Sequence, residues 1–281
     1  MSSGSSKGGA SPRDVEPPPL PEPLAVAVPD SHCHLALMGT DVDEVIAAAA
    51  SVGIDVIVQV GVDVASSRRS AELAASYDVV HAAVALHPNE AGRGAATDAA
   101  LREIEALAHL PQVKAVGETG LDHYRTGSAE GHRLQEASFR AHIAIAKATG
   151  KALVIHDRDA HDDVVRVLLD EGAPDVVVFH CFSGGPELAR TCAEHGWYAS
   201  FAGPVTFKPN DDLRAAAVIL GQDRLLVETD APFLTPAPYR GRPNAPYLVP
   251  LTVRALADTR GEDLDALCHA LAANGRRAFD Y

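Results

Sequence analysis

The chain has 281 residues, of which 47% are hydrophobic, and this suits one domain with a large core. Its net charge of −14, from 24 basic and 38 acidic residues, excludes a broad basic surface that coats nucleic acid, so a phosphate ligand would have to be held by bound cations and a few local Arg or Lys residues. The four cysteines lack a CxxC pair and fit a reducing cytoplasm, and no apolar run reaches the ~18 residues needed to cross a membrane.

The first 23 residues differ in composition from the rest of the chain. They are rich in Ser, Gly and Pro, carry scattered charge and lack the apolar segment of a signal peptide. We therefore predict a disordered extension over residues 1–23 and a folded domain over residues 24–281. We expect the protein to be cytoplasmic, with no obligatory protein partner.

The first apolar run, residues 24–28, leads into a motif with two histidines. Asp30, His32 and His34 alternate along it, so in a strand their side chains share one face. Two imidazoles spaced in this way can bind one ion, and borderline metals accept imidazole readily. The competing interpretation is an accidental pair of surface histidines, which the position directly after an apolar run disfavours.

Further apolar runs follow, with helix-like sequence between most of them. They are residues 56–60, 79–86 and 198–202, together with the shorter runs that end at Gly117, Ile155, Phe179 and Val227. Strand-like runs that alternate with helix-like sequence predict βαβ units around a parallel sheet. Because polar residues follow most of the eight runs, we predict a (β/α)₈ TIM barrel whose active site lies at the C-terminal ends of the strands.

The fourth run ends in Gly117-Glu118-Thr119-Gly120-Leu121-Asp122. The two glycines that flank Glu118 and Thr119 allow a close approach of backbone or ligand. A carboxylate in this place can bridge two cations, whereas a buried carboxylate without a partner costs several kcal/mol. Glu118 is therefore a candidate metal ligand.

His156 and His180 end two consecutive Val-rich runs. Either histidine alone is more often a satisfied core or loop residue, but their equivalent positions favour metal ligation. Asp230 closes the eighth run and can both bind a metal and accept a proton from water. Glu228, two residues earlier, is either a second carboxylate at the metal or a hydrogen-bond partner of a ligand, and we favour the partner role.

Residues near the same strand ends are candidates for substrate binding. His87 can orient a phosphate or cap a loop, and the basic, hydroxyl and amide groups at this rim suit an anion. The candidate substrate-binding residues are His87, Arg158, Ser183, Arg242 and Asn244, with Lys208 and Arg240 in the same late loops. Tyr124, Phe182 and Tyr239 could stack a base, although each could equally pack within the fold.

In their order along the chain, these motifs resemble the TatD family of metal-dependent deoxyribonucleases, in the amidohydrolase-like superfamily of barrels. The resemblance covers roughly residues 26–281 and rests on Asp30-Ser31-His32-Cys33-His34-Leu35, Leu86-His87-Pro88, Gly117-Glu118-Thr119-Gly120-Leu121-Asp122-His123-Tyr124, His156-Asp157-Arg158, His180-Cys181-Phe182-Ser183-Gly184-Gly185, Glu228-Thr229-Asp230-Ala231-Pro232-Phe233-Leu234 and Arg240-Gly241-Arg242-Pro243-Asn244. The departures are small: Thr119 replaces an aliphatic residue of many relatives, and His123 replaces a Tyr.

The resemblance implies a site for two divalent ions, of Mg, Mn, Zn or Fe, and hydrolysis of DNA phosphodiesters by metal-activated water, often as a 3′-to-5′ exonuclease on single strands. The implied ligands are His32, His34, Glu118, His156, His180 and Asp230. We hypothesise that one ion is held by His32, His34, Glu118 and Asp230. The second ion would be held by Glu118, His156 and His180. Asp230 and Glu118 are the predicted catalytic residues.

A metal-dependent amidase or lactonase on a related barrel is the competing function. Many such enzymes bridge two metals with a carboxylated lysine at the end of strand four. Here that position is Glu118, and Lys114 lies at the opposite end of the same run, which disfavours this alternative. A non-catalytic scaffold is a third class, and metal content would separate it from both enzymes.

Overall fold

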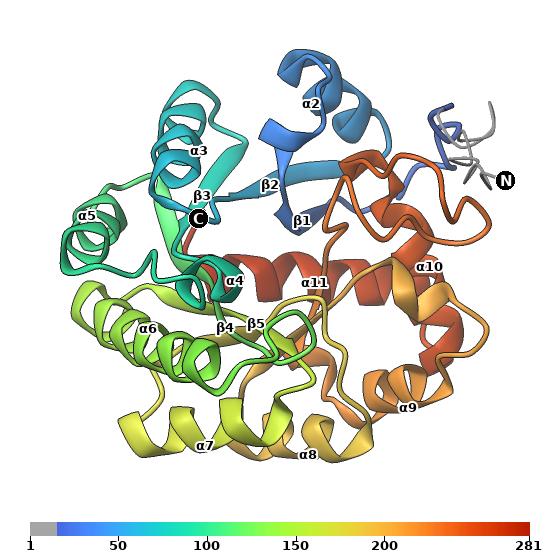
Figure 1. Ribbon diagram of the computed structural model, residues 1–281. Helices are drawn as coiled ribbons and strands as arrows, with labels where there is room; N and C mark the ends of the chain where they lie inside the picture. The colour runs from blue at the N-terminus through green and yellow to red at the C-terminus, as the bar shows by residue number, and fades with distance from the viewer. Residues whose placement is uncertain (1–15) are drawn as a thin grey trace, which may run out of the picture.

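Eight parallel strands form a nearly closed barrel in the computed structural model, which describes residues 16–281 (Figure 1). The strands are β1 (Val28–Cys33), β2 (Ile54–Val60), β3 (Val80–Val84), β4 (Val113–Asp122), β5 (Ala152–Arg158), β6 (Val177–Phe179), β7 (Tyr198–Phe201) and β8 (Leu225–Val227). Each strand pairs with its neighbour in chain order, from β1 to β8. The predicted TIM barrel is therefore confirmed.

Helices connect successive strands on the outside of the barrel, because a parallel pair requires a crossover, and the last two helices follow β8. They are α2 (Val42–Ser51), α3 (Val64–Ser76), α4 (Pro88–Ala91), α5 (Asp98–Ala108), α6 (Ala129–Thr149), α7 (His161–Glu171), α8 (Pro186–His195), α9 (Asp211–Ile219), α10 (Val249–Arg260) and α11 (Leu264–Phe279), with short 3₁₀ turns η1 (Leu35–Leu37), η2 (Gly203–Thr206), η3 (Gln222–Arg224) and η4 (Pro246–Leu248). Several begin at a side-chain cap; Asp63, for example, accepts the backbone N–H of Ser66 at the start of α3. Within residues 16–281, no helix combines the length and apolar content needed to span a membrane.

Backbone hydrogen bonds bring the chain after β8 beside β1. The N–H of Asp230 donates to the carbonyl of His32 at 2.9 Å, and the N–H of His34 donates to the carbonyl of Ala231 at 2.8 Å. Cys33 and Ala231 form an isolated parallel bridge at the same place. This contact nearly closes the barrel and places Asp230 next to both first-strand histidines.

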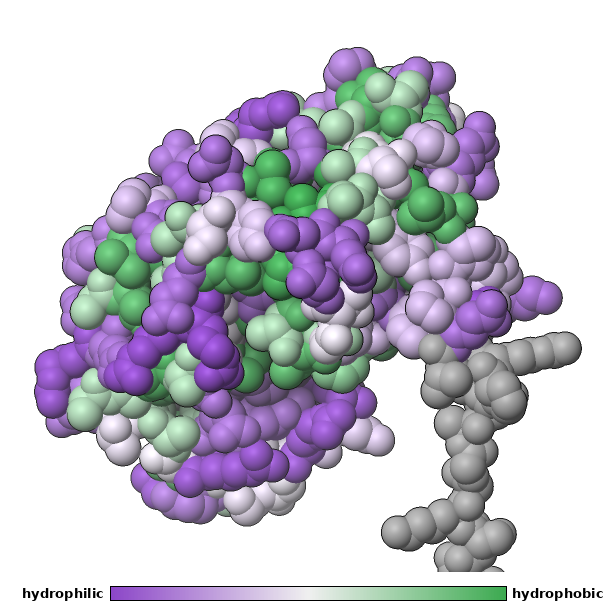
Figure 2. Space-filling view, turned by 90° about the horizontal axis from the view of Figure 1, so that it is seen from above, coloured by the Kyte–Doolittle hydropathy of each residue, from purple (hydrophilic) through white to green (hydrophobic). Residues whose placement is uncertain are grey.

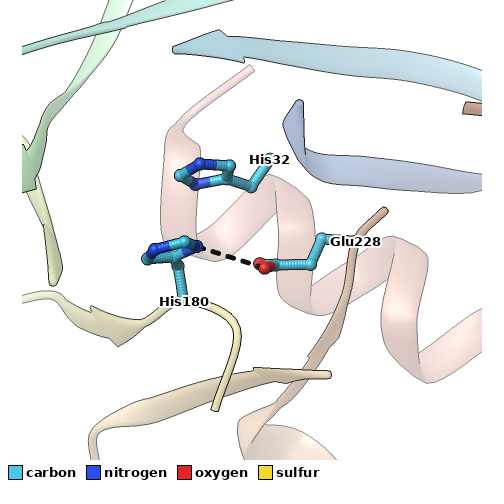
Figure 3. Close-up of side chains that lie close together, drawn as sticks. All are labelled: His32, His180 and Glu228. Carbon is cyan, nitrogen blue, oxygen red and sulfur yellow. Dashed lines mark hydrogen bonds and ion pairs between the residues drawn. The ribbon is translucent and has the colours of Figure 1, made fainter. Parts of the chain in front are cut away.

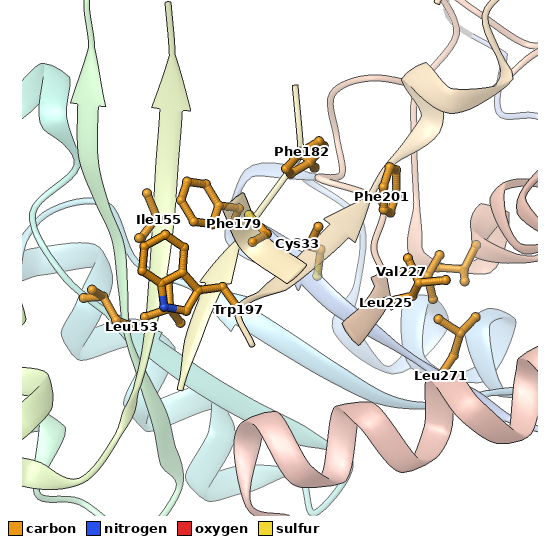
Figure 4. Close-up of a cluster of buried hydrophobic side chains, with 14 of the residues drawn as sticks. Cys33, Leu153, Ile155, Phe179, Phe182, Trp197, Phe201, Leu225, Val227 and Leu271 are labelled. Atoms are coloured by element: carbon orange, nitrogen blue, oxygen red, sulfur yellow. The ribbon is translucent and has the colours of Figure 1, made fainter. Parts of the chain in front are cut away.

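The hydrophobic core has two layers. The outer layer lies between strands and helices, and Figure 4 shows part of it, with Phe179 and Phe201 from strands, Trp197 from just before β7 and Leu271 from α11. The inner layer fills the barrel with small side chains, such as Val58, and is joined by Phe279 from the end of α11. Each fully buried large side chain contributes about 1.5–3 kcal/mol to folding.

Helix α11 crosses the N-terminal end of the barrel (Figure 1). The Asn274 amide donates to the carbonyl of Leu225, at the start of β8, at 2.7 Å. Lys114, near the start of β4, donates to the carbonyl of Asp280 at 2.7 Å. With Phe279 in the inner layer, the N-terminal end of the barrel is closed. The polar C-terminal ends of the strands lie at the opposite end.

The first strand is shifted from the apolar run that predicted it. We expected residues 24–28 to be the strand, but β1 runs from Val28 to Cys33 and contains most of the histidine motif. One of the polar side chains in this buried strand is well paired: the Asp30 carboxylate accepts the backbone N–H of Thr229 at 2.9 Å and the Thr229 hydroxyl at 2.5 Å. Burial raises the pKa of Asp30 to about 8.

The predicted N-terminal extension is described in part. Residues 1–15 lie outside the described residues. Over residues 16–23 the chain lies along the loop that leads into α10: the guanidinium of Arg242 donates to the carbonyl of Glu16 at 2.7 Å, and the Tyr247 hydroxyl donates to the carbonyl of Pro18 at 2.7 Å. In Figure 1 the blue start of the described chain accordingly lies beside the orange loop before α10.

Candidate metal centre

Glu118 owes its position to an unusually close approach of β4 to β5. A Cβ atom on Gly117 would lie 2.4 Å from the Cβ of Val154, and one on Gly120 would lie 2.2 Å from the carbonyl oxygen of His156. Neither contact is sterically possible, so both positions require glycine. The predicted close approach is therefore between two backbones, and it brings Glu118 and His156 to the same mouth of the barrel.

The two carboxylate oxygens of Glu118 face different pairs of histidines. Oε1 lies 3.4 Å from His34 Nε2 and 3.7 Å from His32 Nε2. Oε2 lies 2.9 Å from His180 Nε2 and 3.3 Å from His156 Nδ1. Glu118 thus divides the cluster into two halves, which is compatible with its predicted role as a bridging ligand.

Asp230 completes the first half of the cluster. Its Oδ1 lies 3.4 Å from His34 Nε2 and 3.8 Å from His32 Nε2. The backbone of Asp230 has a φ of 55°, in the left-handed region. The side chain of Asp230 is 14% exposed, against 5% for Glu118, so Asp230 is the more accessible carboxylate. All six predicted ligands therefore meet at one mouth.

His180 is oriented by Glu228 (Figure 3). Glu228 Oε1 accepts from His180 Nδ1 at 3.2 Å and from the backbone N–H of Cys181 at 2.7 Å. The ring of His180 also stacks on that of His32, with centroids 3.9 Å apart. Of the two roles that the sequence left open for Glu228, these contacts favour the partner role, which fixes the tautomer and direction of a ligand histidine.

His156 is oriented by two residues to which the sequence analysis gave no role. Its Nε2 lies 3.2 Å from Asp122 Oδ2, which leaves Nδ1 directed at Glu118. Gln135 of α6 holds Asp122 in turn, because its carbonyl accepts the Asp122 N–H at 3.0 Å and its amide donates to the Asp122 carbonyl at 3.3 Å. The available signal was the position of Asp122, four residues after Glu118 at the end of the same strand.

The chemistry of the buried donors fits divalent metal ions. Three groups of histidine and carboxylate atoms lie close enough to share an ion: His32 with His180 and Glu228, His32 with His34 and Glu118, and His87 with Glu118 and His156. His32 Nδ1 and Glu228 Oε2 are buried without a hydrogen-bond partner in the described residues. Burying unpaired polar atoms costs free energy, which a bound water would recover. Nitrogen and carboxylate donors together suit Zn, Mn or Fe and also permit Mg.

Comparison with known proteins identifies the family. A model of the TatD-related DNase family matches residues 29–280. The chain belongs to the TatD family. It is 45% identical over 257 residues to the uncharacterized metal-dependent hydrolase TatD of Mycobacterium tuberculosis, a match that covers 89% of this chain and 97% of that protein. We therefore describe it as a TatD family metal-dependent hydrolase.

Two further TatD relatives support this placement. One, from Citrobacter rodentium, is named a 3′-5′ ssDNA/RNA exonuclease and is 32% identical over 246 residues, covering 85% of this chain and 92% of the relative. The crystal structure of YJJV, a TatD homolog from Escherichia coli K12, superposes with a TM-score of 0.84 at 27% identity, covering 90% of this chain and 98% of that one. The barrel and its length are thus those of the family.

Three of the predicted substrate-binding residues lie at the rim of this TatD family barrel. His87 Nε2 is 3.7 Å from Glu118 Oε2, while its Nδ1 accepts the N–H of Asn89, so it both faces the cluster and caps α4. Burial lowers the pKa of His87 to about 4. The guanidinium of Arg158 lies over the ring of Tyr124, and the exposed Ser183 hydroxyl donates to the carbonyl of Asp157.

The other two predicted substrate-binding residues have structural partners instead. Asn244 is 2% exposed, and its amide donates to the carbonyls of Thr229 and Phe233. Asn244 therefore holds the loop that carries Asp230, and its Oδ1 accepts the backbone N–H of Ala245, while its substrate contact stays a prediction. The guanidinium of Arg242 binds Glu16 at its carbonyl and, at 3.3 Å, at its carboxylate, and the substrate contact of Arg242 stays a prediction.

Proposed function

We propose that this TatD family hydrolase cleaves phosphodiester bonds of DNA, as a 3′-to-5′ exonuclease on single strands. The observation that carries the proposal is the division of one ligand cluster by the two oxygens of Glu118, which provides places for two cations at the open mouth of the barrel. The relative from Citrobacter rodentium, whose name gives a 3′-5′ exonuclease activity on single strands, supports the choice of substrate.

The proposed ligands divide as the contacts of Glu118 do. His32, His34, Glu118 and Asp230 would hold one ion, and Glu118, His156 and His180 the other. When bound, two divalent ions would polarise the phosphodiester and lower the pKa of the attacking water.

Asp230 is the proposed general base. It is the most exposed carboxylate of the proposed ligand set, so it can accept a proton from water that enters the mouth. Glu118 keeps a negative charge for the proposed bridging role: burial would raise the pKa of its carboxyl, but the charge of His180 and the hydrogen bonds of His156 and His180 outweigh burial and hold the pKa well below its usual range.

DNA must approach a protein with a net charge of −14. Phosphate binding in the proposed mode therefore depends on the bound cations and on local groups such as Arg158, and binding without metal should be weak. We include a cytoplasmic location in the proposal, supported by the four free cysteines.

Many enzymes of the amidase or lactonase alternative use a lysine at the metals. Lys114 instead donates to the carbonyl of Asp280 at the N-terminal end of the barrel, beside α11. No specific contact in the described residues favours this second function.

Metal analysis of the purified protein, followed by assays on end-labelled single-stranded DNA, a lactone and an amide, tests the proposal. We expect one to two divalent ions per chain and stepwise loss of nucleotides from the 3′ end. His156→Ala should weaken one metal site and leave the other. Absence of divalent binding near neutral pH, or hydrolysis of the lactone or amide alone, would overturn the assignment.

A further inference from the structure

Two exposed aromatic rings lie at the mouth that carries the metal cluster. Among the large hydrophobic side chains exposed in residues 16–281, the aromatic ones are Tyr124, at 64%, and Phe233, at 51%. Tyr124 follows the end of β4 by two residues, and Phe233 lies in the loop after β8. On the face shown in Figure 2, hydrophobic residues form separate groups among hydrophilic ones. The exposure of a large aromatic ring is therefore a local feature, and its explanation must be sought in the residues around it.

Phe233 is fixed beside the first half of the cluster. Its ring meets the ring of His34 edge to face, with centroids 6.2 Å apart. Its N–H donates to the carbonyl of Asp230 at 2.9 Å, and its own carbonyl accepts the amide of the buried Asn244. A half-exposed ring held in place at both backbone groups is a preformed surface for stacking.

Tyr124 forms a second surface together with Arg158. The guanidinium carbon of Arg158 lies 3.9 Å from the centroid of the Tyr124 ring, and the N–H of His123 donates to the Arg158 carbonyl at 2.9 Å. The guanidinium covers part of the ring and leaves the rest open to solvent. An Arg stacked in this way keeps N–H groups for a phosphate, while the open ring can take a base.

The two surfaces lie on opposite sides of the metal cluster. Phe233 contacts His34, which follows β1, whereas Arg158 ends β5, the strand that also carries His156. In an eight-stranded barrel with strands in chain order, β1 and β5 face each other across the mouth. A polymeric ligand that passes over the cluster from one surface to the other therefore has its backbone near Glu118 and its side groups at the two rings.

We propose that Phe233 and the Tyr124–Arg158 pair are two base-stacking subsites that hold unpaired nucleotides on either side of the cleaved phosphate. This inference rests on the proposed nuclease function and names the substrate as single-stranded nucleic acid. Every base has a π face, so stacking gives affinity without sequence preference, which an acidic protein cannot obtain from a basic groove. Bases paired within a duplex are unavailable to these rings.

Two oligonucleotides that differ only at the 3′ end test the proposal. One is a normal end-labelled single strand, and the other has abasic residues at its last positions. With metal present, the wild type should show a higher KM for the abasic strand. Phe233→Ala and Tyr124→Ala should each raise KM for the normal strand by about 5- to 150-fold, with a smaller change in kcat, and should reduce the difference between the two strands.

Conservative variants and a distant control separate stacking from general damage. Phe233→Tyr and Tyr124→Phe keep a π face and should retain the preference for the normal strand, whereas Phe233→Leu should lose most of it. Val218→Ala removes a side chain that is 54% exposed on α9, away from the mouth, and should leave both KM values unchanged.

The outcomes distinguish this inference from the nuclease assignment. If the wild type cleaves both strands with equal KM, or if Phe233→Ala and Tyr124→Ala keep the full difference, the stacking subsites are wrong and the nuclease function stands. If the wild type hydrolyses a small phosphate ester but neither oligonucleotide, both proposals are overturned.

Discussion

The two ends of this barrel are built from the same strands and treat buried groups in opposite ways. At the N-terminal end, Phe279 joins a cluster of small apolar side chains, and nearby polar groups such as Lys114 have partners within the chain. At the C-terminal end, Glu118 lies among histidines, and two buried polar atoms, on His32 and Glu228, have no partner in the described residues. One end stabilises the fold, and the other keeps a binding capacity that a ligand must complete.

Two buried carboxyl groups, those of Asp30 and Glu118, are accommodated in different ways. Asp30, in the first strand, is buried, and burial raises its pKa although its carboxyl oxygens accept hydrogen bonds from Thr229 and from the backbone N–H of His32. Glu118 is buried with its charge retained, which requires cationic neighbours or metal ions. Substitutions at the two ends should therefore separate stability from turnover, and four changes test this, in order of decreasing free energy.

The largest expected effect is at the closed end. Phe279→Ala removes a fully buried ring and should lower the free energy of unfolding by about 3–5 kcal/mol, measured by denaturant titration. Metal content and kcat per folded molecule should be retained, because no predicted ligand contacts Phe279. A large loss of kcat with normal stability would show that the two ends are coupled.

The next effect is at the open end. Asp230→Asn keeps shape and an oxygen donor but removes charge and basicity, so kcat at saturating metal should fall at least about 100-fold. The melting temperature should change little. Asp223→Asn is the matched control, because this exposed carboxylate lies just before β8 and should affect neither quantity. Near-normal turnover of Asp230→Asn would refute its role as a base.

A smaller effect is expected at Asp122, which orients the predicted ligand His156. Asp122→Asn weakens the hydrogen bond that orients His156 and should lower metal affinity by about 10- to 100-fold, measured by calorimetry. Gln135→Leu, which reaches His156 through Asp122, should give a weaker change in the same direction. Unchanged affinity in both variants would mean that the ring of His156 is positioned by packing alone.

The smallest effect is expected at Lys114. Lys114→Met removes a hydrogen bond to the Asp280 carbonyl and should cost less than about 1 kcal/mol of stability, with metal content and kcat unchanged. This result would show that the start of β4, at Lys114, contributes to stability and not to metal binding or turnover. Loss of bound metal in this variant would instead support the competing amidase or lactonase chemistry.

Local patterns in the chain were enough to predict the barrel and the cluster of histidines and carboxylates. Apolar runs followed by His34, Glu118, His156, His180 or Asp230 predict strands that end in donors, and parallel strands bring their C-terminal ends to one mouth. The prediction was less accurate at β1, whose bounds depend on whether Asp30 is paired, and that pairing comes from Thr229, far along the chain.

The sequence by itself determined the type of fold, the family and the residues that gather at the mouth, because strand period and motif order are local properties of the chain. Only the tertiary structure decided which nitrogen of each histidine faces Glu118, that Asp122 and Gln135 support His156, and that Asn244 is buried. These outcomes depend on contacts between segments far apart in the chain, where side-chain direction and burial are set by the neighbours and not by residue type.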